Sequence, residues 1–96
     1  MTDKELIKYL VDNNDYKYNL LKTAEELNEL STILLQYVNK ENKVDKQKII
    51  EEIGDSIIRI EVLKKLFNEK KIKLRINFKL KKFKTYIKNK KYIGKI

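Results

Sequence analysis

The chain contains no cysteine, no histidine and no proline, and only two of its 96 residues are glycine. Without cysteine or histidine it has no disulfide bond, no zinc site of the usual type, no cysteine nucleophile and no histidine-based triad. Any general base or metal ligand must therefore be an oxygen group or a lysine. The shortage of turn-forming residues argues against a β-sandwich or barrel and favours helices.

The length indicates one small domain that comprises residues 1–96. A chain of this size buries only roughly 60–65% of its unfolded surface, so we expect association into an oligomer to complete the core. No apolar run approaches the roughly 20 residues that cross a bilayer. Residues 1–10 carry charges throughout and lack the apolar stretch of a signal peptide, so we expect a cytoplasmic protein without a membrane partner.

Positive charge is concentrated towards the C-terminal end. The whole chain has a net charge of +9, but residues 1–69 hold 11 basic and 14 acidic side chains, whereas residues 70–96 hold 12 basic and no acidic ones. Lysine, isoleucine and asparagine dominate the sequence, and all three are encoded by A/T-rich codons. The bias of an AT-rich bacterial or phage genome explains the charge without functional pressure, and we rank it above nucleic-acid binding.

Apolar residues recur at helical spacing along most of the chain. Each expected helix also begins after a residue that caps helix N-termini, and the first has a capping box made by Thr2 and Glu5. Three helices are predicted, with caps at Thr2, Asp15 and Asp45, over residues 2–11, 16 to about 40, and 45 to about 67.

The second and third of these helices are expected to form an antiparallel hairpin over residues 16–67, because the connector is short. We expect the hairpin to pack through its apolar stripes. The stripes consist of Leu20, Ala24, Leu27, Leu34 and Val38, broadened by Leu30 and Ser31, in one helix and of Ile49, Ile50, Ile53, Ile57, Ile60 and Leu63/Lys64 in the other.

The basic C-terminal segment, residues 68–96, has two interpretations. Apolar residues alternate over residues 72–80, as in a half-buried strand, but they also share a helical face with Phe83 and Ile87. A lone strand without a sheet partner is marginal, so we predict a helix capped by Asn68. The predicted fold is all-α, of the four-helix-bundle type, completed by oligomerisation.

Two acidic pairs lie beside the apolar stripes of the hairpin. Glu26 and Glu29 share one helical face, and so do Glu52 and Asp55, because residues three apart are neighbours on a helix. If the helices pack through their stripes, the four carboxylates converge near the seam. Gly54 supports this, since glycine within a helix costs about 1 kcal/mol and suggests close backbone approach.

A hard divalent cation would offset the repulsion between these carboxylates. Oxygen ligands without histidine favour magnesium, with manganese as the alternative. The competing interpretation is that the acids are solvated surface groups, with Lys22 in a simple salt bridge to Glu26. Two matching pairs on adjacent helices favour the cation site over that interpretation.

The pattern E-x-x-E on one helix and E-x-x-D on the next resembles the signature of the MazG-like all-α nucleoside triphosphate pyrophosphohydrolases. Residues 19–30 look like the first motif helix of that family and residues 51–55 like the second. Residues 79–83 are similar to a basic C-terminal helix of small phage and bacterial members. The resemblance covers residues 16 to about 87.

The resemblance implies magnesium-dependent hydrolysis of an NTP or dNTP to the monophosphate and pyrophosphate, as part of nucleotide-pool housekeeping. It implies Glu26, Glu29, Glu52 and Asp55 as metal ligands, with a metal-activated water attacking the α-phosphorus. Glu25 or Glu29 would orient that water. The resemblance also implies a homodimer or homotetramer, which agrees with the expected oligomer. The candidates for substrate contact are Asn19, Lys22, Lys79 and Lys82.

Two other functions stay open at this point. A small helical nucleic-acid-binding protein would use residues 70–96 to follow phosphates, and its affinity would fall steeply with salt. A catalytically inactive, regulatory member of the family is the other. Within the family resemblance, activity on phosphoribosyl-ATP is an alternative reaction.

Overall fold

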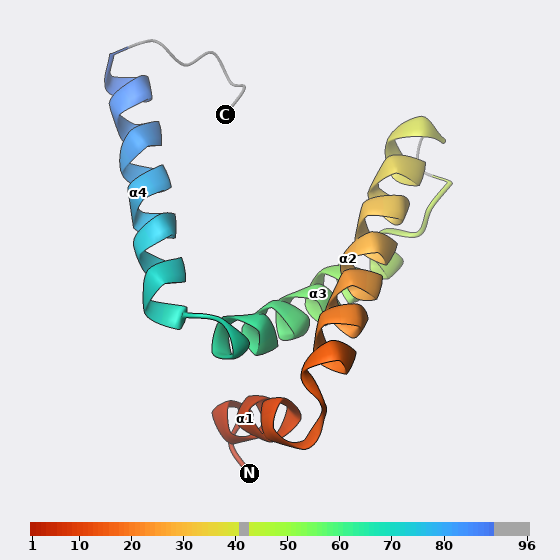
Figure 1. Ribbon diagram of the computed structural model, residues 1–96. Helices are drawn as coiled ribbons and strands as arrows, with labels where there is room; N and C mark the ends of the chain where they lie inside the picture. The colour runs from red at the N-terminus through yellow and green to blue at the C-terminus, as the bar shows by residue number, and fades with distance from the viewer. Residues whose placement is uncertain (41–42, 90–96) are drawn as a thin grey trace.

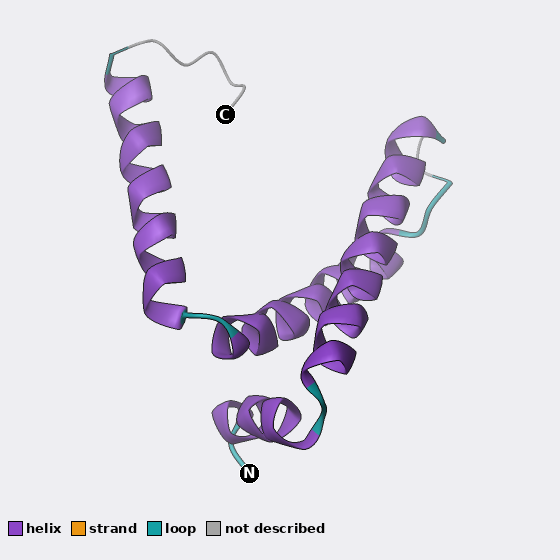
Figure 2. Ribbon diagram, viewed as in Figure 1, coloured by secondary structure: helices purple, strands orange, loops and turns teal. Residues whose placement is uncertain are grey.

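The computed structural model describes residues 1–40 and 43–89. Within these ranges the regular elements are all helices, joined by short loops, as Figure 1 and Figure 2 show. The four helices are α1 (Asp3–Asn13), α2 (Tyr16–Asn39), α3 (Lys46–Leu66) and α4 (Glu69–Lys88).

The helix starts agree with the caps predicted from the sequence. The Thr2 hydroxyl accepts a hydrogen bond from the Glu5 backbone N–H, and the Glu5 carboxylate accepts one from the Thr2 N–H, which completes the capping box. A side-chain oxygen also accepts a backbone N–H at each of the other three starts. These caps are Asp15, Asp45 and Asn68. The prediction of a helix over residues 70–80 is thereby confirmed, and the strand interpretation is wrong.

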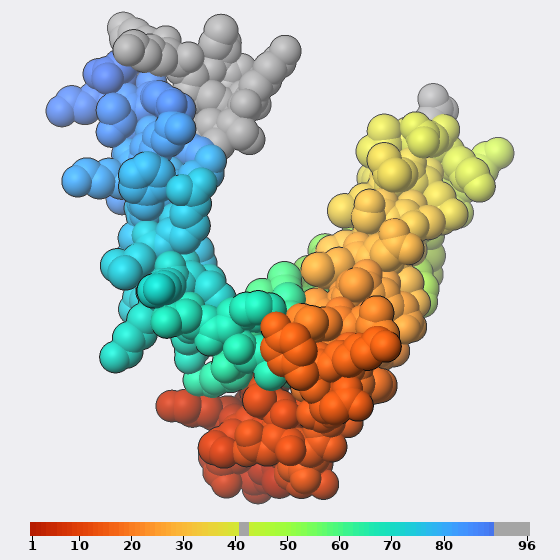
Figure 3. All heavy atoms as spheres, in the orientation of Figure 1, coloured from red at the N-terminus to blue at the C-terminus, as the bar shows by residue number. Residues whose placement is uncertain are grey.

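The helices α2 and α3 form the predicted hairpin, and α1 packs against α3 beneath it (Figure 1). By contrast, α4 extends away from the hairpin, and its main contact is with α3. Figure 3 shows open space between α4 and α2. The radius of gyration is 16.9 Å, whereas a compact domain of this length would have about 12.5 Å. One chain is therefore more extended than a closed bundle.

The seam between α2 and α3 is largely polar, which differs from the expectation. Asn19 is 0% exposed and Ser56 is 2% exposed, whereas the buried hydrophobic side chains in the described residues are Ile33 and Val62. The predicted stripes do not form the seam. Leu34 in α2 and the α3 isoleucines of the stripe, apart from the half-buried Ile49, remain exposed.

A hydrogen-bond network centred on Arg59 explains how the seam tolerates polar groups. Arg59 is 8% exposed, and its Nη2 donates to the backbone oxygen of Asn19 at 3.1 Å and to its Oδ1 at 2.9 Å. Its Nε donates to Thr23 Oγ1 at 3.4 Å, and that hydroxyl donates to the Asn19 backbone oxygen at 2.7 Å. Buried polar groups are stable when they are hydrogen-bonded in this way.

The expectation for Gly54 is wrong. A Cβ atom placed there would meet nothing within 4 Å, so no neighbouring group within the chain requires glycine at this position. Across residues 1–40 and 43–89, none of the helices combines the length and the apolar character needed to cross a membrane.

Candidate metal centre

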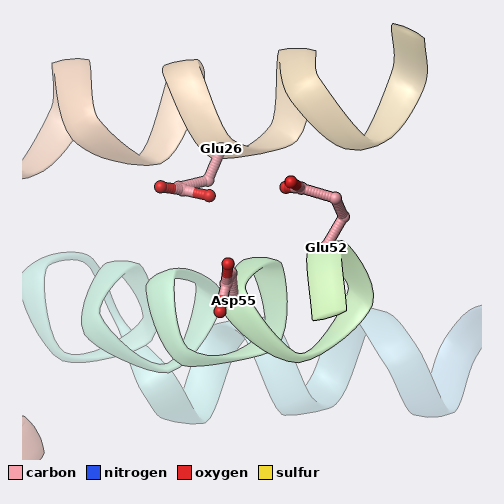
Figure 4. Close-up of side chains that lie close together, drawn as sticks. All are labelled: Glu26, Glu52 and Asp55. Carbon is pink, nitrogen blue, oxygen red and sulfur yellow. The ribbon is translucent and has the colours of Figure 1, made fainter. Parts of the chain in front are cut away.

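Three carboxylates from the two hairpin helices converge on one point. Glu26 reaches it from α2, and Glu52 and Asp55 reach it from α3, with one oxygen of each within 4.8 Å of the others. Figure 4 shows all three side chains pointing into the space between the helices. Glu52 and Asp55 share a face because they are three residues apart, and the hairpin brings Glu26 opposite them.

Two of these carboxylates have a buried oxygen without a hydrogen-bond partner. The atoms are Glu26 Oε2 and Glu52 Oε2, and the Glu52 side chain is only 6% exposed. A buried, unpartnered polar atom costs about 1–3 kcal/mol, and more when the group is charged. The fold holds these oxygens next to a third carboxylate, so a cation bound between them would satisfy both oxygens.

A lysine one turn upstream pairs with each of the two glutamates. Lys22 Nζ lies 3.3 Å from Glu26 Oε1 and also 3.3 Å from Glu25 Oε1, while Lys48 Nζ lies 3.1 Å from Glu52 Oε1. Hydrogen bonds to Glu25 and Glu26 raise the pKa of Lys22, and the hydrogen bond to Glu52 raises the pKa of Lys48. The salt bridge considered for Lys22 from the sequence is therefore present. Each lysine occupies one oxygen of its glutamate and leaves the other oxygen unpartnered.

Glu29 lies beside this group and outside the set of three mutually close carboxylates. Repulsion from Glu26, followed by desolvation and repulsion from Glu52, raises the pKa of the exposed Glu29 carboxyl. Glu29 and Glu52 both line a shallow cavity of about 350 Å³, together with Lys48. The expected convergence of four carboxylates thus holds for three, and the fourth lines the neighbouring cavity.

We expect Glu29→Gln to stabilise the metal-free protein at pH 7. A carboxyl whose pKa is higher in the folded state than in the unfolded state destabilises the fold as pH rises above its unfolded value of 4.5. The gain should therefore disappear below pH 4.5, where both states are protonated. Urea unfolding in the presence of a chelator measures this, with the exposed neighbour Glu51→Gln as the control. A gain that does not change with pH would contradict repulsion as the cause.

The donor set fits a small, hard divalent cation. Carboxylate oxygens are the ligands that magnesium and manganese take in proteins, and the two unpartnered oxygens offer positions that a cation would satisfy. Glu26, Glu52 and Asp55 would hold the ion, with Glu29 the additional predicted ligand at the edge of the group. The mouth of the shallow cavity beside Glu52 leaves room for a further oxygen ligand from outside the chain.

The other predicted site residues lie in different surroundings. Asn19 is fully buried and hydrogen-bonded to Arg59, so it has no surface with which to contact a nucleotide. Glu25 is exposed and paired with Lys22. Lys79 and Lys82 lie on α4, where their ammonium groups sit over the rings of residues 83 and 86 at 5.3 and 5.5 Å. The chain does not bring them to the carboxylates.

Sequence reasoning missed two residues of the site region. Lys48 stands four residues before Glu52, just as Lys22 stands four residues before Glu26, and this repeated spacing could have identified it. Arg59 is one of only two arginines in a lysine-rich chain. Arginine is preferred where a buried cation must make several fixed hydrogen bonds, so its rarity here was the available signal.

Comparison with protein-family models, with curated proteins and with solved structures finds no match to this chain.

Proposed function

We propose that the protein is a magnesium-dependent nucleoside triphosphate pyrophosphohydrolase, which converts a (d)NTP and water into the monophosphate and pyrophosphate. The observation that carries this proposal is the group formed by Glu26, Glu52 and Asp55, with one oxygen of each within 4.8 Å and two buried oxygens unpartnered. The resemblance of E-x-x-E and E-x-x-D to the MazG-like signature supplies the reaction type.

Each residue of the site has a role in this proposal. Glu26, Glu52 and Asp55 hold the ion, and bound magnesium offsets charge on the triphosphate and activates a water molecule. Glu29 lies at the cavity beside Glu52 and outside the group that holds the ion, so its carboxylate is available to accept a proton from water. It is therefore the stronger candidate for orienting water, ahead of Glu25.

Lys22 and Lys48 supply positive charge next to the carboxylates. Both ammonium groups are within 3.3 Å of a site glutamate, and a divalent cation on those glutamates would weaken both pairings. Lys48, which lines the cavity, could then turn towards phosphate oxygens there. Of the lysines proposed for substrate contact, Lys22 pairs with a site glutamate, whereas Lys79 and Lys82 lie on α4.

The test is release of pyrophosphate from a mixture of dNTPs. Purified protein with magnesium should yield pyrophosphate and monophosphates in equal amounts, and a chelator should stop the reaction. Release of inorganic phosphate, or release that needs no divalent cation, would contradict the proposal. Manganese binding without pyrophosphate release would instead favour the catalytically inactive, regulatory alternative.

A second candidate function rests on α4. Residues 70–88 carry nine basic side chains and no acidic ones, and α4 extends away from a body with more acidic than basic residues (Figure 1). Such a surface suits the phosphates of a nucleic acid. This function would require α4 and no divalent cation, whereas the first requires the hairpin carboxylates.

The proposal also includes a homo-oligomer, a dimer or a tetramer, in which bundle packing is completed between chains. Cytoplasmic nucleotide pools would be the substrate source.

A further inference from the structure

The helix α4 carries a narrow row of apolar side chains, which we call the α4 stripe. It consists of Ile72, Ile76, Leu80, Phe83 and Ile87. Its members follow one another by three or four residues, and at about 100° per residue they fall within an arc of about 80°. Ile76, Leu80 and Ile87 are 49%, 50% and 60% exposed, whereas the other two members are half-buried. The stripe is therefore a continuous apolar surface along most of the helix.

Basic side chains border the α4 stripe along both of its edges. By the same geometry, Lys73 lies about 20° beyond one edge and Lys79 about 20° beyond the other. The Lys79 ammonium group lies 5.3 Å from the centre of the Phe83 ring, so its positive charge is next to the apolar row. Residues 70–88 include nine basic residues and no acidic one. No carboxylate within this segment therefore neutralises the charge.

Most of α4 lies apart from the other helices. Its main contact is with α3, and Figure 3 shows open space between α4 and α2. Apolar surface left in water is unfavourable, so the α4 stripe favours a partner that removes it from water. The basic edges require that partner to be negatively charged.

An anionic lipid bilayer meets both requirements. An amphipathic helix lies in the plane of the bilayer, with its apolar side chains below the lipid headgroups and its lysines extended towards the headgroup phosphates. A nucleic acid would pair with the lysines but would leave the stripe in water, because its phosphates form a polar, charged outer surface. The α4 of a second copy carries the same positive charge and would be repelled.

We propose that α4 binds the surface of an anionic bilayer through the α4 stripe, with its basic side chains at the lipid phosphates. The expectation of no membrane partner rested on the lack of an apolar run that spans a bilayer, and a helix that lies on the surface needs none. The carboxylates of the candidate metal centre are on α2 and α3 and take no part in this contact. Lipid binding and hydrolysis can therefore be tested separately.

The test measures cosedimentation of the full chain with lipid vesicles. We expect binding to vesicles that contain phosphatidylglycerol and phosphatidylcholine, and at least about tenfold weaker binding to phosphatidylcholine alone, because several lysines contribute to the attraction. Added salt should weaken the binding for the same reason. Glu52→Gln should bind these vesicles as the wild type does, since Glu52 lies on α3.

Two leucine variants of α4 separate insertion of the stripe from a purely electrostatic contact. Leu80 belongs to the stripe, whereas Leu74 lies about 160° from its middle and is 66% exposed. Leu80→Glu and Leu74→Glu remove the same side chain and add the same charge, so both should weaken binding about fivefold through lost attraction. Leu80→Glu should weaken it on the order of a hundredfold, because it also replaces an apolar group within the bilayer by a charge.

Equal losses for the two leucine variants would overturn the proposal, and so would a lack of binding to the anionic vesicles. Tighter binding to single-stranded DNA than to vesicles, weakened equally by both variants, would assign α4 to a nucleic acid instead.

If Leu80→Glu does not fold, fluorescence decides. The chain has no tryptophan, so Phe83→Trp places a single probe in the α4 stripe, and Phe78→Trp places a matched probe about 160° from its middle. With anionic vesicles, the emission of the first variant should shift to shorter wavelength, because its indole leaves water. The emission of the second should stay unchanged. The same response from both probes would contradict a contact made through the stripe.

Discussion

Glu52→Gln is expected to abolish pyrophosphate release, with a fall on the order of a thousandfold or more. The substitution keeps the shape of the side chain but removes the negative charge of the most buried carboxylate in the group. Neutral amide oxygens are poor ligands for a hard divalent cation compared with carboxylates. The variant should therefore also bind manganese more weakly. Pyrophosphate assays measure the loss of activity, and manganese titration of the same preparation measures the loss of metal binding.

Glu51→Gln is the matched control for this experiment, because it makes the same chemical change one residue away at an exposed position. It should keep both activity and metal binding. In the metal-free state, Glu52→Gln should be more stable than the wild type, since it removes a buried charge with an unpartnered oxygen. Equal activities for the two variants, or a less stable metal-free Glu52→Gln protein, would contradict the assigned role.

Arg59→Ala is expected to lower the free energy of unfolding by about 2–4 kcal/mol. The change removes three hydrogen bonds and leaves Asn19 Oδ1 buried without its donor. It also opens a cavity in a seam that holds few apolar side chains. Arg59→Lys should lower the free energy of unfolding by less, because lysine keeps the charge. It should still be less stable than the wild type, because lysine lacks the planar fork that reaches two oxygens of Asn19 and the hydroxyl of Thr23.

The control for Arg59→Ala is Arg75→Ala, which changes the other arginine of the chain. Arg75 is exposed on α4 and lies over the Phe78 ring at 5.3 Å. We therefore expect its removal to lower the free energy of unfolding by less than about 1 kcal/mol. Urea unfolding at one fixed protein concentration compares the variants, because association would shift the apparent stability. Similar losses for the two arginines would show that the buried network contributes little.

Local sequence signals were sufficient to predict the helices. Capping side chains act on backbone N–H groups within three residues, so Thr2 and Asn68 mark helix starts without knowledge of the rest of the fold. Local signals could not predict which residues pack between the two helices of the hairpin. Hydrophobic periodicity identifies the apolar face of a helix, but it does not reveal which other element packs against that face.

The candidate site was predicted in part for a similar reason. The spacing of Glu52 and Asp55 is local, so their common face followed from helix geometry. The position of Glu26 opposite them depends on how α2 and α3 are aligned, which the polar seam determines. Spacing also placed Glu29 on the face of Glu26, and motif position alone suggested Asn19. Only the packing shows that Glu29 lies at the edge of the group and that Asn19 is buried.

The polar seam has a consequence for the alignment of the two helices. Side chains of similar size in an apolar seam can exchange places with little loss, so two apolar helices tolerate a shift along each other. A slide by one turn, about 5.4 Å, would separate Arg59 from the oxygens of Asn19. The same slide would carry Glu26 away from Glu52 and Asp55. The arginine network thus fixes the register on which the carboxylate group depends.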